Sequence, residues 1–214
     1  MSSKSVKWIG SDEAGKGDYF GPLVVAGVLV DNTTVKSLQE LGVRDSKRLS
    51  ENSIKELAIR INRQCLCSVV TIGPERYNEL YNKIGNLNCL LAWGHSRTIE
   101  NILNREKCDY ALADQFGDKK FIADALMEKG KRIEVKQEIR AESDMGVAAA
   151  SILARAEFIR RLAMLSAKYE MDFPKGASPA VIRAGKEFVN RYGRERLNEV
   201  AKLHFKTTKS VLAE

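Results

Sequence analysis

Apolar residues along this chain fall into two patterns, short continuous runs and longer segments with helical spacing. Residues 23–30 (LVVAGVLV) form an almost unbroken run of aliphatic, largely β-branched side chains, which predicts a strand buried on both faces. Shorter runs predict further strands over residues 6–10, 65–72, 109–113 and 132–139. Glycine, proline, asparagine or aspartate follows several of these runs, as expected where strands end in turns.

Helical spacing covers most of the remaining chain. It predicts helices over residues 35–42, 50–62, 74–83, 86–106, 119–130, 143–168 and 179–192, with another possible helix in the tail. The longest begins at a Ser143 cap, and its small residues 147–151 (VAAAS) would let it approach the sheet closely. Strands and helices mixed in this way predict an α/β fold. Because no linker or repeat interrupts the pattern, we expect one domain over residues 1–214. Its α/β core would reach about residue 165, and a helical C-terminal extension would cover about 166–214.

Composition narrows the class of protein. Lys and Arg outnumber Asp and Glu by 35 to 28, and the resulting charge of +7 favours an anionic partner such as nucleic acid. No apolar segment has the length of a membrane helix, and the N-terminus lacks the apolar core of a secretion signal. The four cysteines contain no CxxC pair, so we expect reduced thiols in a cytoplasmic protein. His95, within a helical pattern beside Trp93, is interpreted as structural rather than catalytic.

Four acidic residues occupy positions from which they could meet at one site. Asp12 and Glu13 follow the first strand, Asp114 ends another, and Glu142 precedes the longest helix. Strand ends of an α/β sheet converge on one edge, where such folds place their sites. Clustered carboxylates repel one another unless cations neutralise them, and an all-oxygen ligand set favours Mg²⁺ or Mn²⁺. Two such ions would suit hydrolysis of a phosphodiester.

Each acid also has a simpler interpretation. Asp12 could form a turn, Asp114 could cap a helix, and Glu142 could be an ordinary charge near the positive end of a helix. Adjacent residues of an extended strand point to opposite faces. Asp12 and Glu13 are therefore expected to share a site only if the chain turns at them, within the segment 10–22 (GSDEAGKGDYFGP). Two adjacent acids cost stability and add nothing to the packing of the core, which favours a functional site over the simpler interpretations.

Two basic segments are candidates for binding phosphate. Gly15 and Gly17 would let backbone amides approach a nucleic-acid backbone, and Lys16 between them could pair with a phosphate. Ser46 and Lys47, in the loop RDSKRLS, form a second candidate. The alternative is that both segments are solvated surface loops.

Taken together, these motifs resemble the type 2 ribonucleases H, the family of ribonucleases HII and HIII. The segments DEAGKGDYFGP, DSKRLS, ALADQF and AESDMGVAAASILAR occur in the order of the family's motifs, between about residues 8 and 208. The segments NLNCLLAWGH, FPKGAS and KLHFKTT are more similar to ribonuclease HIII than to ribonuclease HII.

The resemblance implies a ribonuclease-H-like mixed central sheet flanked by helices. It also implies an endonuclease that cuts the RNA strand of RNA–DNA hybrids and leaves 5′-phosphate and 3′-hydroxyl ends. We expect the protein to be a monomer. Two Mg²⁺ or Mn²⁺ ions would be held by Asp12, Glu13, Asp114 and Glu142, and the backbone of residues 15–17 would recognise the ribose 2′-hydroxyl.

Some alternatives stay open at this point. The fourth acid is Glu142 or, two residues on, Asp144, and the similarity to ribonuclease HIII favours Glu142. Ribonucleases HIII typically carry an N-terminal substrate-binding domain, whereas about seven residues precede the first predicted strand here. Affinity for the hybrid would then rest on the core and its helical extension, or on a partner. The alternative functions are a non-catalytic binder of RNA–DNA hybrids and a DNA nuclease of the same fold.

Overall fold

A mixed five-stranded sheet lies at the centre of the computed structural model, which describes residues 6–43 and 49–213. Its strands are β1 (Lys7–Ala14), β2 (Leu23–Asp31), β3 (Leu66–Ile72), β4 (Tyr110–Asp114) and β5 (Glu134–Glu138), in the order β3-β2-β1-β4-β5. The three strands β3, β2 and β1 are antiparallel neighbours, whereas β4 and β5 run parallel to β1. The predicted α/β fold with a mixed sheet is confirmed.

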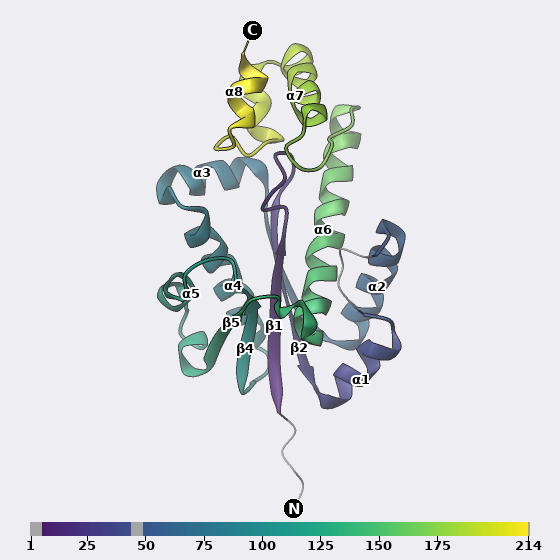
Figure 1. Ribbon diagram of the computed structural model, residues 1–214, viewed down its shortest axis with the longest axis vertical. Coiled ribbons are helices and arrows are strands. Elements are labelled where there is room, and N and C mark those ends of the chain that lie inside the picture. The colour runs from purple at the N-terminus through teal and green to yellow at the C-terminus, as the bar shows by residue number, and fades with distance from the viewer. Residues whose placement is uncertain (1–5, 44–48, 214) are drawn as a thin grey trace, which may run out of the picture.

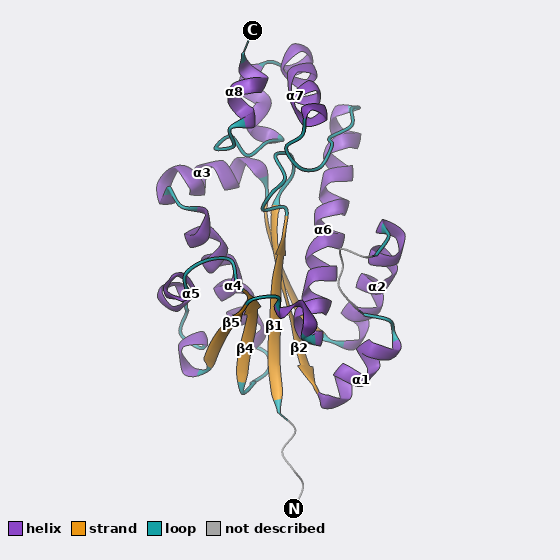
Figure 2. Ribbon diagram, viewed as in Figure 1, coloured by secondary structure: helices purple, strands orange, loops and turns teal. Residues whose placement is uncertain are grey.

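Helices cover both faces of this sheet, which Figures 1 and 2 show nearly edge-on. The helices are α1 (Asn32–Glu40), α2 (Glu51–Gln64), α3 (Pro74–Ile84), α4 (Leu87–Leu103), α5 (Lys119–Ala125), α6 (Met145–Tyr169), α7 (Pro179–Tyr192) and α8 (Thr207–Leu212). Helices α1, α2 and α6 lie on one face, and α3, α4 and α5 lie on the other. Helices α7 and α8 sit beyond the end of the sheet where β1 turns into β2.

Helix α6 packs directly on β1. A Cβ atom added to Gly10 would lie 2.1 Å from the carbonyl carbon of Gly146 and 2.2 Å from the nitrogen of Val147, so only glycine permits this approach. All residues from Gly146 to Ala150 are buried, as their small side chains predict. The strand and the N-terminal part of the helix are thereby held at a fixed separation.

Strand β1 is longer than predicted. Asp12 and Glu13 pair with Ala26 and Val25 of β2, and the strand ends only at Ala14. The prediction that the chain turns at the two acids is wrong, because the ladder with buried β2 extends the polar end of the strand. The turn begins instead at Gly15, whose φ of +86° is a conformation that favours glycine.

Two helix ends also differ from prediction. The cap of α6 is Asp144 rather than Ser143, and its side chain accepts a hydrogen bond from Val147 N. Helix α5 ends at Ala125, five residues earlier than predicted. The buried carboxylate of Glu100 accepts the amides of Lys129 and Gly130, which draws that backbone into a separate 3₁₀ turn.

The C-terminal helices share an apolar core with the sheet. Phe188 of α7 and Val211 of α8 belong to the same buried cluster as Val24 of β2 and Phe158 of α6. Aromatic contacts at the end of α6, such as the edge-on pair Tyr169–Phe188, continue this cluster into the extension. The C-terminal helices and the sheet therefore bury their apolar side chains in one common cluster.

Candidate active site

The site lies where β1 extends past its neighbour β4. Pairing of the two strands ends at Ser11 and Ala113, while β1 continues to Ala14. A cavity of about 520 Å³ opens there. Its lining includes all four predicted acids, namely Asp12, Glu13, Asp114 and Glu142. Residues separated by up to 130 positions in the sequence therefore meet at one place, as the convergence of strand ends predicts.

The two adjacent acids approach this cavity from opposite faces of the sheet. The Asp12 side chain is hydrogen-bonded to Ser151 of α6, and the Glu13 side chain reaches His95 of α4. This is the alternation expected of an extended strand. Both carboxylates still line the cavity because β4 has ended there, so no turn between them is needed.

Asp12 is a buried carboxyl group that lies close to two other acids. Burial raises its pKa to about 7, and the negative charges of Glu13 and Asp114 add to the increase. Hydrogen bonds from Ser151 and from the Glu13 amide, the latter at 2.8 Å, oppose this shift only in part. A cation in the cavity would relieve this repulsion, and the donor set, made of carboxylate oxygens, is the set that Mg²⁺ and Mn²⁺ prefer.

Glu13 uses both of its oxygen atoms. Lys16 Nζ lies 2.9 Å from Oε1, and His95 Nε2 lies 3.2 Å from Oε2. Burial alone would raise the pKa of Glu13, but the hydrogen bond and charge of His95, together with Lys16, outweigh it and bring the pKa to about 2. Glu13 is thus held as a carboxylate, which accepts hydrogen bonds without donating any.

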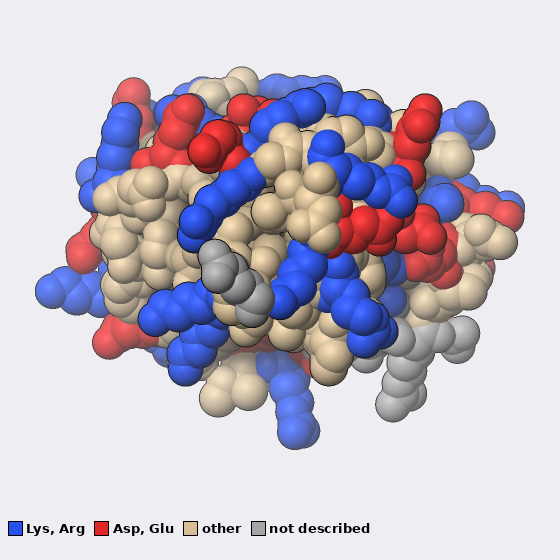
Figure 3. All heavy atoms as spheres, turned by 90° about the horizontal axis from the view of Figure 1, so that it is seen from above, with Lys and Arg blue, Asp and Glu red and all other residues tan. Residues whose placement is uncertain are grey.

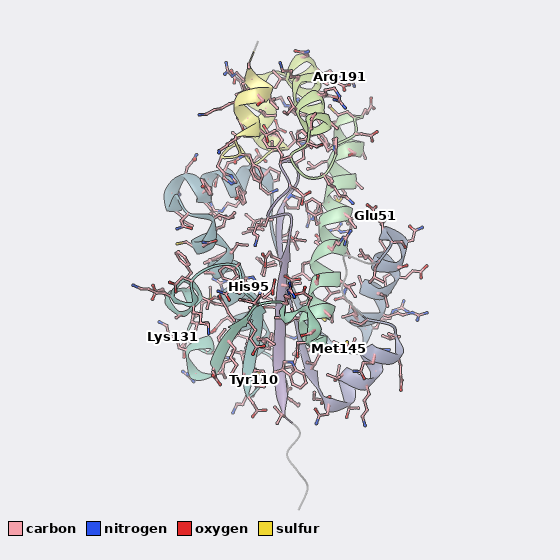
Figure 4. All side chains as sticks on the ribbon, viewed as in Figure 1. Glu51, His95, Tyr110, Lys131, Met145 and Arg191 are labelled. Atoms are coloured by element: carbon pink, nitrogen blue, oxygen red, sulfur yellow. The ribbon has the colours of Figure 1, made fainter. Side chains whose placement is uncertain are left out.

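His95 was not expected at the site. It is fully buried, it stacks on Phe116, and its Nδ1 lies 2.9 Å from Ser11 Oγ. Since ionised Glu13 can only accept, Nε2 must donate to it, and the ring forms a chain from Ser11 to Glu13. In Figure 4 His95 lies beside β1, opposite the start of α6 marked by Met145. Its helical, apolar surroundings in the sequence gave no sign of this contact.

The connection from β5 to α6 separates the two candidates for the fourth acid. Arg140 adopts a left-handed conformation with φ of +60°, and Ala141 N then donates to Asp114 Oδ1 at 3.0 Å. Glu142 follows and lines the cavity. Asp144 instead accepts hydrogen bonds from Val147 N and from the indole of Trp8, both at 3.0 Å. Its oxygens are engaged in capping α6 and in holding β1, which supports Glu142 as the fourth acid.

The glycine turn forms one wall of the cavity. Gly15 is required by its positive φ and because a Cβ there would lie 2.2 Å from Pro22 O. Gly17 differs, since nothing lies within 4 Å of its Cβ position. The space beside Gly17 is therefore open to a ligand. Arg155 of α6 and Lys175, from the loop before α7, also line this cavity, although the sequence did not single them out.

Comparison with known families decides the identity of the fold. The family model described as Ribonuclease HII matches residues 9–208. The chain belongs to this family. Membership makes it a ribonuclease H, and it confirms the resemblance to type 2 enzymes drawn from the order of the motifs.

Curated relatives agree with the expected similarity to ribonuclease HIII. The chain is 47% identical to a ribonuclease HIII from Protochlamydia amoebophila, over 96% of this chain and 68% of that protein. It is 45% identical to one from Chlamydia caviae, over 93% and 67% of the two chains.

Solved structures of the type 2 ribonucleases H share the fold. Bst-RNase HIII, determined in complex with Mn²⁺, superimposes with a TM-score of 0.89 at 32% identity, covering 99% of this chain and 70% of that one. RNase HII from Archaeoglobus fulgidus, solved in a complex with PCNA, gives a TM-score of 0.79 at 30% identity and covers 97% of each chain.

Not every predicted contact can be placed in this ribonuclease H. Ser46 and Lys47 lie outside the described residues. Within residues 6–43 and 49–213, no three His, Cys, Asp or Glu side chains are arranged to hold a metal ion as they stand. No helix in the described part of the chain is long and apolar enough to cross a membrane.

Proposed function

We propose that this ribonuclease H cleaves the RNA strand of RNA–DNA hybrids and leaves 5′-phosphate and 3′-hydroxyl ends. The observation that carries the proposal is the meeting of four carboxylates, from β1, β4 and the turn before α6, at one cavity. They are Asp12, Glu13, Asp114 and Glu142. The Mn²⁺ complex of the related Bst-RNase HIII supports the view that these carboxylates bind divalent cations.

The four carboxylates would hold two Mg²⁺ or Mn²⁺ ions. When bound, such ions supply an activated water and stabilise the leaving oxygen. Burial raises the pKa of Asp12 to about 7 in the free protein, so Asp12 would have to lose its proton in order to hold a cation. Glu13 would hold a cation while it remains bonded to Lys16 and His95, and the hydrogen bond and charge of His95 keep its carboxylate ionised and oriented.

Positive side chains around the cavity would orient the nucleic acid. Lys16, Arg155 and Lys175 all line it, and each can approach a phosphate of the bound strand. Basic residues also extend beyond the cavity. Figure 3 views the end of the molecule that carries α7 and α8, and Lys and Arg are distributed over much of this end between smaller groups of acids. This distribution supports a polyanionic substrate.

Recognition of RNA is assigned to the glycine turn. The 2′-hydroxyl distinguishes RNA from DNA at a given nucleotide, and it can both donate and accept a hydrogen bond. The open space beside Gly17 lets a ribose approach the backbone of residues 15–17 without meeting a side chain. A strand without the 2′-hydroxyl would lose this contact.

The decisive experiment compares wild type with Asp12→Asn and Asp114→Asn. Each change preserves size and removes one charge, so the fold should survive while hybrid cleavage falls at least about 100-fold. The substrates are a labelled RNA–DNA hybrid, a DNA duplex with one ribonucleotide and plain duplex DNA, each with Mg²⁺ and with Mn²⁺. Asp124→Asn, at an exposed position of α5, is the control.

Each alternative function predicts a different result. A hybrid that binds to wild type and is not cut with either cation would identify a non-catalytic binder. Cleavage of plain duplex DNA would identify a DNA nuclease. Wild-type rates in either asparagine variant would refute the assignment of the site.

A further inference from the structure

Lys202 is a buried lysine that contacts the far end of the glycine turn. It lies in the segment between the 3₁₀ turn Arg194–Glu199 and α8, and none of its surface is exposed. Its Nζ donates to the carbonyl oxygens of Asp18 at 2.7 Å and Gly21 at 2.8 Å. One side chain thereby holds both ends of the short stretch that follows the proposed substrate-binding residues 15–17.

This ammonium group is not balanced by an ion pair. Among the residues described, no carboxylate oxygen lies within ion-pairing distance of Lys202. Burial lowers its pKa to about 7, and the charge of Asp18 opposes this only in part. A buried cation is costly, and an apolar side chain would fill the same space at less cost. The feature that an apolar residue could not supply is the pair of hydrogen bonds to the turn.

The backbone around Lys202 follows the same turn. Lys202 N donates to Tyr19 O, and Gly21 N donates to Val200 O, each at 2.9 Å. Phe20 and Ala201 form an antiparallel bridge between these two bonds. The C-terminal segment therefore pairs with the turn as a short strand would, and the lysine side chain adds two bonds to it.

Helix α3 fixes this segment from its other side. Asn78 Nδ2 donates to Ala201 O, and Asn78 Oδ1 accepts from Leu203 N, both at 2.9 Å. The two bonds lie on either side of Lys202 in the chain. The lysine is consequently held on a backbone that cannot shift without breaking contacts with a second element.

The acids of the site depend on different contacts. Asp12 and Glu13 belong to β1, and their backbones pair with β2 in the middle of the sheet. Gly15 and Gly17 lie beyond the last of these pairs, where the turn is held by the C-terminal segment and by Gly176, which bonds to Asp18 and Tyr19. Loosening that segment would move the glycines and leave the carboxylates in place.

We propose that Lys202 is a positioning residue that holds the glycine turn in the conformation that recognises the RNA strand. The inference rests on the proposed function of the turn. It makes the C-terminal segment a determinant of substrate affinity and of the preference for RNA over DNA, and it leaves the chemical step to the acids of the sheet.

The test is Lys202→Met, which keeps the length and removes both donors. We expect KM for the hybrid to rise about tenfold, equivalent to 1.4 kcal/mol, with kcat within about twofold of wild type. Binding to a hybrid and to a DNA duplex of the same sequence is measured separately in EDTA, and the preference for the hybrid should fall by the same factor. Asn78→Ala leaves the ammonium in place and should change KM in the same direction by less, which keeps the test decisive if the methionine variant does not fold.

The control is Val211→Ala, in α8, where the side chain packs against Gly185 of α7 and makes no hydrogen bond to the turn. It should lower thermal stability with KM unchanged. An equal rise in KM in this variant would overturn the inference, because general loosening would then explain the effect. So would a Lys202→Met variant with wild-type KM and hybrid preference, or one in which kcat alone falls. Wild type that binds hybrids selectively without cutting them would refute the proposed function, while the binding comparison would still test Lys202.

Discussion

Replacing His95 by phenylalanine should weaken the site without touching a proposed metal ligand. The new ring can keep the stack on Phe116, but it loses the bonds to Ser11 Oγ and Glu13 Oε2. Glu13, which is almost fully buried, would keep its ion pair with Lys16 and lose its contact with His95. We therefore expect a less stable fold and a carboxylate that is less well oriented.

The size of the effect follows from the contacts of Glu13. The His95 hydrogen bond is the largest influence that lowers the pKa of Glu13 to about 2. A hydrogen bond to a charged group contributes roughly 1.5–3 kcal/mol. A loss of about 2 kcal/mol corresponds to a fall of about 4–8 °C in the melting temperature of a chain of this size. Removing a side chain that orients a metal ligand typically costs about 10–100-fold in metal affinity or activity.

The lowered pKa of Glu13 also determines how its contribution to stability changes with pH. Because the folded pKa of Glu13 lies below its ordinary value of 4.5, its contribution to stability is complete above pH 4.5 and disappears as the pH falls toward 2. The free energy of unfolding should thus differ between wild type and His95→Phe at neutral pH, and the two should converge in acid. Urea titrations at several pH values measure this difference, and calorimetric titration with Mn²⁺ measures the affinity of the site.

A neighbouring substitution provides the control. Ser96 is buried in the same helix, and its hydroxyl has no hydrogen-bond partner in the described structure. Ser96→Ala should therefore change neither stability nor Mn²⁺ affinity appreciably. His95→Phe could instead bind Mn²⁺ with wild-type affinity and unfold at the same urea concentration as wild type. That result would show that the His95–Glu13 hydrogen bond contributes neither to stability nor to metal binding, and it would refute the reasoning.

Three further predictions test the rest of the site. Gly10→Ala forces a Cβ into the backbone of α6 and should cost at least about 1–3 kcal/mol in urea unfolding. Gly73→Ala has nothing within 4 Å of its Cβ and should cost less, about 1 kcal/mol, because alanine is a poorer N-cap of α3 than glycine. Glu142→Gln should lower the rate of hybrid cleavage and leave the melting temperature unchanged. Asp144→Asn should keep the wild-type rate, because asparagine can still cap α6, and the reverse pattern would make Asp144 the fourth acid. Mn²⁺ affinity should rise from about pH 5.5 to about pH 7.5 and then level off, because the cation must displace the proton that burial holds on Asp12; a flat profile by calorimetry would contradict this.

The sequence predicts the fold best where burial alone decides the structure. Strand β2 and helix α7 lie within one or two residues of their predicted bounds, because an apolar run or an apolar stripe is enough to specify each. The end of β1 could not be found this way. Its acids are polar, and their strand conformation depends on pairing with Val25 and Ala26, which lie more than ten residues away.

Contacts between distant segments also limit how much of the site can be predicted from the sequence. The four acids could be named because each stands next to a recognisable strand end or helix start. His95 and Lys202 could not, since each looks like an ordinary member of a helix or tail until the fold brings it to Glu13 or to Asp18. The sequence left Asp144 open beside Glu142, and the bonds of Asp144 to Trp8 and to the start of α6 became visible only in the fold.

The pair Asp12–Glu13 shows why the site needs both helical layers of the fold. A strand directs adjacent side chains to opposite faces, so no single helix can support both acids. Here α6 supplies Ser151 to Asp12, and α4 supplies His95 to Glu13. The result is two neighbouring carboxylates of different character, one with its pKa raised to about 7 and one with its pKa lowered to about 2. A change in either helix should therefore remove the direct contact of one acid and reach the other only through the repulsion between the two carboxylates, and Ser151→Ala and His95→Phe test the two layers one at a time.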